Sequence, residues 1–304
     1  MRRTDYREAM RRFAAFTLIL IGLACGGGNP KDPPSGLVVA TSIPPHAWLI
    51  ERIGGEAVEV HTVLRPGESP TTHQPSDLQV SRVLESTVFF SAGVPFESGA
   101  WFNSLDGLLE IVALQDGVTN RIMEGHSHSH GTPPNAQGRA ASGLDPHAWL
   151  SPMRLMMQAR IVTATLSRLD PEHAAVYAVN LESLITELVE LDRSIQTTMA
   201  PFAGRAFVVF HPSWGYFADD YRLEQIAIEI EGKQPTDAEL TAIKRATAAH
   251  GITVVYVQPQ IAGQAAQALA DAIGARVETL DPLAPDVPAN LRQVADSIRR
   301  GFDG

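Results

Sequence analysis

Strand-like and helix-like segments alternate along most of this chain, and they do so in two separate series. Runs rich in β-branched and aromatic residues predict four strands in each series. The eight predicted strands are Leu37–Thr41, Val58–Val63, Thr87–Ala92, Ile111–Leu114, Ala206–His211, Gln225–Ile230, Ile252–Gln258 and Arg276–Asp281. Helical patterns separate them, for example between Thr236 and His250. This alternation favours an α/β fold with two lobes and mostly parallel sheets.

One long helical pattern lies between the two series. Asp170 is suited to the N-cap and Pro171 to the first helical position. The apolar residues that follow recur at spacings of three and four; they are Leu181, Leu184, Leu188, Leu191, Ile195 and Met199. A helix of about 29 residues is about 43 Å long, which exceeds a small lobe. We therefore predict a rigid linking helix over 170–201, between an N-terminal lobe (37–169) and a C-terminal lobe (202–304).

Charge and cysteine content exclude several classes of protein. The 304 residues include 24 Lys and Arg against 34 Asp and Glu, which gives a net charge of −10. This balance argues against nucleic-acid binding, because little basic charge is left to neutralise phosphates, and it is compatible with attracting cations. Ten histidines stand against a single cysteine, Cys25, which excludes a disulfide framework and a multi-cysteine zinc site.

The N-terminus predicts export from the cytoplasm. Five arginines in the first twelve residues precede an apolar run from Phe13 to Ala24, which is too short to span a bilayer as a helix. This pattern is typical of a secretory signal over 1–24. Ala24-Cys25 resembles the end of a bacterial lipoprotein signal, although Gly22 stands where Leu is common. The resemblance implies that Cys25 is acylated and that 25–36 is a flexible tether; the alternative is an ordinary signal peptide.

A low-complexity segment, 124–143, interrupts the first lobe. It contains three alternating histidines, His126, His128 and His130, among Ser, Gly, Pro and Asn. Such tracts bind divalent transition metals weakly and flexibly. We expect an accessory His-rich loop that collects or senses metal, and the alternative is a solvated loop whose histidines have no role.

Four other histidines lie beside turn residues and not within regular helices. His46 and His73 occupy loops that follow predicted strands, His147 lies between two prolines, and His211 ends a predicted strand, as does Asp281. Ligands of open α/β sheets collect at the carboxyl ends of the strands. Three imidazoles and one carboxylate form a set that suits tetrahedral Zn²⁺. Because these residues come from distant segments, metal held between two lobes is the natural arrangement.

Several motifs occur in a characteristic order. They are Thr41-Ser42-Ile43-Pro44, the loop around His73, Asp145-Pro146-His147-Ala148-Trp149-Leu150-Ser151-Pro152, Phe210-His211-Pro212 with Tyr216-Phe217-Ala218, Val257-Gln258-Pro259-Gln260 and Leu280-Asp281-Pro282-Leu283. With them the chain resembles the zinc/manganese-type solute-binding lipoproteins of bacterial ABC transporters, from about Val38 to Leu291. The His-rich insertion is similar to that of the zinc branch.

The resemblance implies a cleft between two lobes, with metal at its centre. Residue by residue, the implied metal ligands are His73, His147, His211 and Asp281, with His46 as an additional or alternative ligand. Two positions depart from the family pattern. The His73 loop lacks the Pro-His that many members have, and Gln258 stands where many members have Glu.

The identity of the third ligand favours zinc over manganese. Manganese-type members typically have a carboxylate where this chain has His211, and imidazole suits Zn²⁺ whereas carboxylate and water suit Mn²⁺. We therefore expect an extracytoplasmic protein, in the periplasm or at the cell surface, that captures Zn²⁺ as its transported substrate. It would deliver the ion to an ABC-type permease with a cytoplasmic ATPase, as a lipid-anchored monomer that catalyses nothing.

Three alternatives belong to other classes. The first is a Mn²⁺-specific homologue. The second is a secreted zinc hydrolase, for which Glu68 or Glu231 would be the general base, although neither lies in a motif that fixes it beside a metal. The third is a surface adhesin, or a binder of a metal-independent solute, in which the histidines are incidental.

Overall fold

The fold is that of a computed structural model. The structure describes residues 36–123, 143–229, 236–260 and 263–304. The predicted signal segment, Cys25 and the histidines of the His-rich loop lie outside these ranges, so the predictions made for them remain predictions.

The first sheet is built from the predicted strands of the N-terminal lobe. Its strands are β1 (Leu37–Thr41), β2 (Val58–Thr62), β3 (Val88–Ser91) and β4 (Glu110–Ala113), in the order β2-β1-β3-β4. All neighbouring strands are parallel. The helices that connect them are α1 (Pro44–Gly54), α2 (Asp77–Leu84) and α3 (Ala100–Asn103). Because β1 and β3 lead to opposite sides of the sheet, their carboxyl ends form a topological switch point.

The second sheet repeats this order in the C-terminal lobe. Its strands are β5 (Ala206–Val209), β6 (Glu224–Ala227), β7 (Val254–Val257) and β8 (Arg276–Thr279), in the parallel order β6-β5-β7-β8. The connecting helices are α6 (Gly215–Asp220), α7 (Asp237–His250) and α8 (Gly263–Ile273). The central pair, β5 and β7, forms the second switch point.

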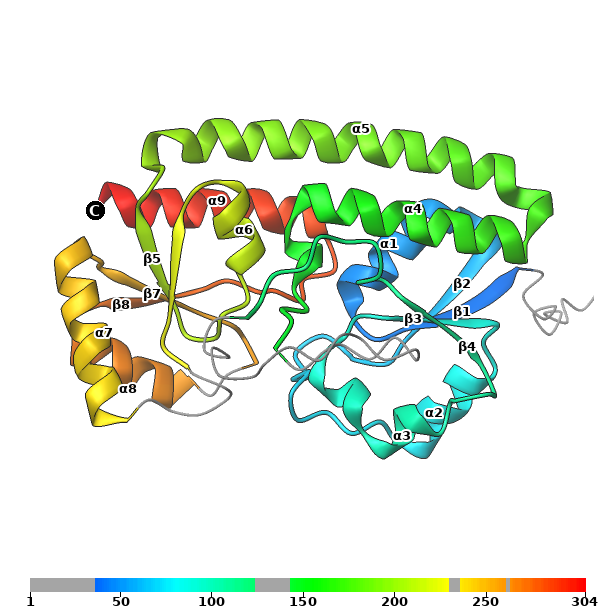
Figure 1. The fold of residues 1–304 in the computed structure, drawn as a ribbon, viewed down its shortest axis with the longest axis horizontal. Helices are drawn as coiled ribbons and strands as arrows, with labels where there is room; N and C mark the ends of the chain where they lie inside the picture. The colour runs from blue at the N-terminus through cyan, green and yellow to red at the C-terminus, as the bar shows by residue number, and fades with distance from the viewer. Residues whose placement is uncertain (1–35, 124–142, 230–235, 261–262) are drawn as a thin grey trace, which may run out of the picture. The chain divides into compact units, whose positions relative to one another are not determined.

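A long helix packs against both lobes. Helix α5 (Ala174–Met199) lies alongside α4 (Pro152–Leu169) and α1 of the first lobe and alongside α9 (Val287–Asp303) of the second (Figure 1). Its predicted stripe is buried at Leu184, Leu188, Leu191, Ile195 and Met199. These residues belong to one apolar cluster that also contains residues of both sheets. The prediction of two parallel α/β lobes joined by one long rigid helix is therefore confirmed.

The start of the long helix differs from the prediction. Pro171–His173 form a 3₁₀ turn, and the α-helix begins at Ala174. The Asp170 carboxylate makes no capping bond to the backbone. It accepts hydrogen bonds instead from the Tyr177 hydroxyl, at 2.7 Å, and from His173 Nδ1, at 2.8 Å.

No helix in the part of the chain that the structure describes is both long enough and apolar enough to cross a membrane.

The buried stripe of α5 leads to a stability prediction. Leu188→Ala should lower the free energy of unfolding by about 2–5 kcal/mol, because Leu188 is fully buried and its loss leaves a cavity. Val189→Ala, at the next and partly exposed position of the same helix, should change it by no more than about 0.5 kcal/mol. Urea unfolding followed by circular dichroism measures both values. Equal effects of the two substitutions would contradict the packing described here.

Candidate metal centre

The residues predicted as ligands follow the carboxyl ends of strands. His46 comes after β1 but lies in the first turn of α1, and not in a loop as the sequence predicted. His73 follows β2, His211 follows β5 and Asp281 follows β8. His147 lies in the loop before α4. The β1 and β5 positions belong to the two switch points, where open α/β sheets bind their ligands.

His147 is held by a buried carboxylate. Its Nδ1 lies 2.7 Å from Asp145 Oδ1, and its backbone N–H donates to the same oxygen at 3.0 Å. Asp145 is fully buried, and its Oδ2 accepts a hydrogen bond from Arg121 Nη1 at 2.9 Å. Since Nδ1 is engaged with the carboxylate, Nε2 is the nitrogen left to bind a metal.

The protonation states of this pair suit a metal ligand. Burial lowers the pKa of His147 below its usual range, despite the opposing pull of Asp145, so the ring is neutral. Burial alone would raise the pKa of Asp145, but hydrogen bonds from His147 and Arg121 outweigh burial and hold that pKa below its ordinary value. The site therefore contains a neutral imidazole supported by an ionised carboxylate, which is the form that coordinates metal.

His211 has the same arrangement on the other lobe. Its Nδ1 lies 3.3 Å from Glu229 Oε2, in a side-chain pair that is largely buried. The rings of His211 and His147 meet edge to face, with 5.4 Å between their centroids. The structure thus brings together one predicted ligand from each lobe.

His73 is also paired with a carboxylate. Its Nδ1 lies 3.4 Å from Glu68 Oε2. Its Nε2 is buried and has no hydrogen-bond partner among the described residues, and its ring packs edge-on against Phe96. Glu68, nominated from sequence as a hydrolytic base, therefore lies beside a predicted ligand; Glu231, the other nominee, is outside the described residues.

His46 is the most deeply buried of the histidines that the structure describes. Its ring packs edge-on against Trp149, whose ring also contacts His147. Burial lowers the pKa of His46 to about 3, so this imidazole is neutral. The Gln158 side chain lies near enough to oppose this lowering of the pKa in part, but neither ring nitrogen has a partner within ordinary hydrogen-bond distance in the described part of the chain.

Asp281 lies in the turn after β8 and is fixed from two sides. Its Oδ1 accepts hydrogen bonds from the Leu283 backbone N–H at 2.9 Å and from Gln260 Nε2 at 3.2 Å. The next residue, Pro282, accepts a bond from Trp149 Nε1 at 2.7 Å. The turn that carries Asp281 is thereby tied to the loop that carries His147.

The described residues do not form a closed metal site. Within the four described ranges, no three His, Cys, Asp or Glu side chains are gathered closely enough to hold an ion. His147 and His211 are in contact, whereas His73, Asp281 and His46 have other neighbours. The assignment of all four ligands therefore stays a prediction. The accessory histidines His126, His128 and His130 lie outside the described residues.

Sequence reasoning assigned no role to several residues around these histidines. Asp145 stands in a motif that was recognised, and its position two residues before His147 is the signal that could have identified it. Glu229 is 18 residues from His211, and Arg121 is 24 residues from Asp145. Neither separation corresponds to a local motif, so these two partners become visible only in the folded chain.

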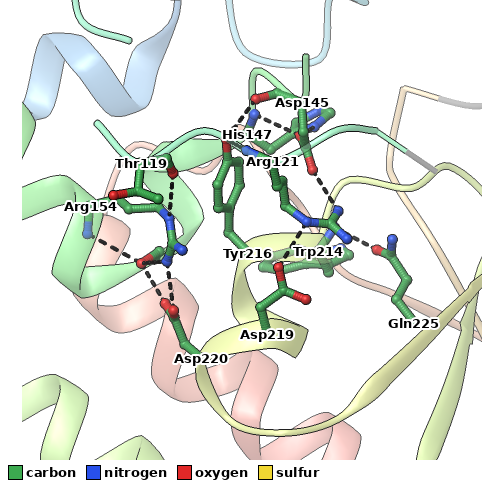
Figure 2. A network of polar contacts seen from close by, with 11 residues as sticks. Thr119, Arg121, Asp145, His147, Arg154, Trp214, Tyr216, Asp219, Asp220 and Gln225 are labelled. Atoms are coloured by element: carbon green, nitrogen blue, oxygen red, sulfur yellow. Dashed lines mark hydrogen bonds and ion pairs between the residues drawn. The ribbon is translucent and has the colours of Figure 1, made fainter. Parts of the chain in front are cut away.

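Polar contacts join the two lobes next to His147 (Figure 2). Arg121 Nε donates to Asp219 Oδ2 at 3.0 Å, and Arg154 Nη1 donates to Asp220 Oδ1 at 2.6 Å. Both arginines lie over the ring of Tyr216. Asp219, Asp220 and Tyr216 all belong to α6. The Tyr216 hydroxyl donates to the Asp145 backbone oxygen at 3.0 Å.

Comparisons with known proteins agree with this architecture. High-affinity zinc uptake system protein ZnuA of Bacillus subtilis (strain 168) is 24% identical over 282 residues, which cover 89% of this chain and 87% of the relative. The protein of the same name from Paracoccus denitrificans (strain Pd 1222) is 29% identical over 245 residues, covering 72% and 74%. Both relatives are therefore similar to this chain over most of their length.

Solved structures show the same fold. A crystal structure of ZnuA has a TM-score of 0.78 and 34% identity, and the likeness covers 88% of this chain and 99% of that one. The laminin-binding protein Lmb of Streptococcus agalactiae has a TM-score of 0.73 at 21% identity, which shows the fold alone.

The family model named for the zinc-uptake complex component A, periplasmic, matches residues 39–301. The match covers both sheets, the linking helix and all the strand ends described above, and it confirms the family that the motifs indicated. This chain belongs to the periplasmic zinc-uptake component A family of solute-binding proteins.

Proposed function

We propose that this protein captures Zn²⁺ outside the cytoplasm and delivers it, as transported substrate, to an ABC-type permease with its cytoplasmic ATPase. The observation that carries the proposal is a repeated arrangement. His73, His147 and His211 each direct Nδ1 at a carboxylate, which leaves Nε2 on each ring to face an ion. The names of the relatives, which are zinc uptake proteins, support the same substrate.

The proposed ligands are His73, His147, His211 and Asp281. Three imidazoles and one carboxylate give a nitrogen-rich set, which Zn²⁺ accepts and Mn²⁺ disfavours. Since His147 and His211 come from opposite lobes and are already in contact, the ion would be held between the lobes. His46, whose ring packs edge-on against Trp149, stays an additional or alternative ligand in this proposal.

The proposal includes a location and a physical state. A signal over 1–24 would direct export, and acylation of Cys25 would anchor a monomer to the membrane through the 25–36 tether. The His-rich loop would act as a weaker accessory site. Catalysis is not part of the proposed function, because capture and release of the ion require no bond to be made or broken in a substrate.

Zinc binding should be visible as a gain in thermal stability. At about 1,000 times its dissociation constant, Zn²⁺ should stabilise the native state by about 4 kcal/mol, and Mn²⁺ should stabilise it much less. His147→Ala and His211→Ala should remove the zinc effect, because each deletes a central ligand. Differential scanning calorimetry with and without each metal measures these shifts.

The control is His250→Ala, which removes an exposed histidine at the end of α7 and should leave the zinc shift unchanged. A native protein that gains no stability from zinc would refute the proposed function.

The carboxylate behind His211 should affect affinity without being a ligand. Glu229→Ala removes the group that faces His211 Nδ1, so the ring loses its fixed orientation, and zinc affinity should fall by about 10–100-fold. Glu224→Ala, an exposed position on β6 of the same lobe, should leave affinity unchanged. Competition with a fluorescent zinc chelator measures both constants. If the two variants bind alike, Glu229 has no orienting role.

The His-rich loop should be dispensable for tight binding. Deletion of residues 126–130 removes three histidines but none of the proposed interlobe ligands, so one tight site should remain while the weaker binding sites disappear. Isothermal titration calorimetry gives the stoichiometry and affinity of each class of site. Loss of the tight site in the deletion variant would mean that the loop, and not the strand ends, holds the transported ion.

A further inference from the structure

Arg121 makes two hydrogen bonds that lead to the loop carrying His147. Its Nη1 donates to the buried Asp145 Oδ2 at 2.9 Å. The other oxygen of Asp145 faces His147 Nδ1. The backbone N–H of Arg121 donates to the Tyr216 hydroxyl at 3.1 Å, and that hydroxyl donates to the Asp145 carbonyl oxygen. Arg121 is therefore connected to the proposed metal ligand His147 through one intervening side chain, that of Asp145.

The same guanidinium reaches across to the other lobe. Arg121 follows β4 of the N-terminal lobe, and its Nε donates to Asp219 Oδ2 on α6 of the C-terminal lobe at 3.0 Å. The Arg121 side chain is 17% exposed and the Asp219 side chain 52% exposed. A single planar cation thus bridges a carboxylate behind the metal site and a carboxylate on the opposite lobe, which a point-like ammonium could not do with the same geometry.

The backbone of α6 is shaped to admit this guanidinium. Its first residue is Gly215, and a Cβ built there would lie 1.6 Å from Arg121 Nη1 and 3.0 Å from Asp145 Oδ2. Only a residue without a side chain leaves room for the bridge. The Tyr216 ring lies against both Arg121 and Arg154, as Figure 2 shows, so the position of Arg121 depends on where α6 sits.

A neighbouring bridge makes no hydrogen bond to the carboxylate that faces His147. Arg154 joins the lobes through Asp220, and its other hydrogen bonds go to Ser151 Oγ and the Thr119 carbonyl oxygen. It has similar burial to Arg121, since its side chain is 16% exposed. Arg154 therefore serves as a matched control for an interlobe ion pair as such.

We propose that Arg121 is a positioning residue for metal binding. Through Asp145 it fixes the ring orientation of His147, and through Asp219 it makes that orientation depend on contact with the C-terminal lobe. The inference rests on the proposed zinc function, since it assigns a role in retaining that ion. Separation of α6 from Arg121 would loosen His147 and favour release, so that the state of the lobes and the hold on the ion are coupled.

The test compares Arg121→Met with Arg154→Met in the full chain. Zinc affinity is measured by chelator competition, and the dissociation rate is measured by stopped-flow transfer of zinc to an excess of chelator. The visible absorption of Co²⁺ bound in place of zinc reports ligand geometry, and urea unfolding of the metal-free protein reports stability. Arg121→Met should weaken zinc affinity by about 10–100-fold, mainly by faster dissociation, and should alter the Co²⁺ spectrum.

Arg154→Met should cost similar stability in the metal-free protein but change zinc affinity by less than about threefold and leave the Co²⁺ spectrum intact. The inference is overturned if Arg121→Met binds zinc within about threefold of the native protein, or if Arg154→Met weakens binding as much. If Arg121→Met does not fold, Gly215→Ala provides the test, because its methyl group displaces the guanidinium while keeping every charge. Native affinity in that variant would equally overturn the inference, whereas a native protein that binds no zinc would refute the proposed function instead.

Discussion

The described site depends on the hydrogen bonds made by the buried carboxylate of Asp145. A fully buried charge is costly unless its hydrogen-bonding capacity is used. Here one oxygen faces the backbone N–H and Nδ1 of His147, and the other accepts from Arg121. The loop around His147 therefore has little freedom to rearrange, because any other conformation would leave this charge without partners.

The same pairing recurs at lower strength around the site. His211 faces Glu229 at 3.3 Å and His73 faces Glu68 at 3.4 Å, against 2.7 Å for His147 and Asp145. Each carboxylate favours one tautomer and so selects Nε2 as the nitrogen that meets an ion. The gradient in distance indicates that His147 is the most preorganised of the three. His73, in the loop after β2, has the longest distance to its carboxylate, and that carboxylate is partly exposed. A bound ion would therefore order the His73 ring more than the other two rings.

The fold could be predicted from the sequence because the strand cores are continuous apolar runs. The carboxylates that pair with the histidines could not be predicted in this way. Strand ends were less certain: β5 ends at Val209 and not at His211, because Phe210 and His211 already turn toward the loop. The histidines stood out through their turn residues. Asp219 lies 98 residues from Arg121, and nothing in the local sequence of either residue indicates the other. Periodicity reports which face is buried, but it does not report which charges meet after folding.

The network between the lobes becomes more exposed to solvent from its inner to its outer end, which suits capture of the ion followed by its release. Its inner end, Asp145, is fully buried, so breaking the contact there leaves an uncompensated charge. Its outer end, Asp219, is half exposed, and an ion pair at such a position contributes at most about 1 kcal/mol because water replaces it easily. Separation of the lobes would therefore begin at Asp219, while Asp145 keeps its hold on His147. In that order His147 loses the contact with the C-terminal lobe before it loses its bond to Asp145. The binding of the ion can therefore be weakened stepwise without unfolding the loop that must bind the next ion.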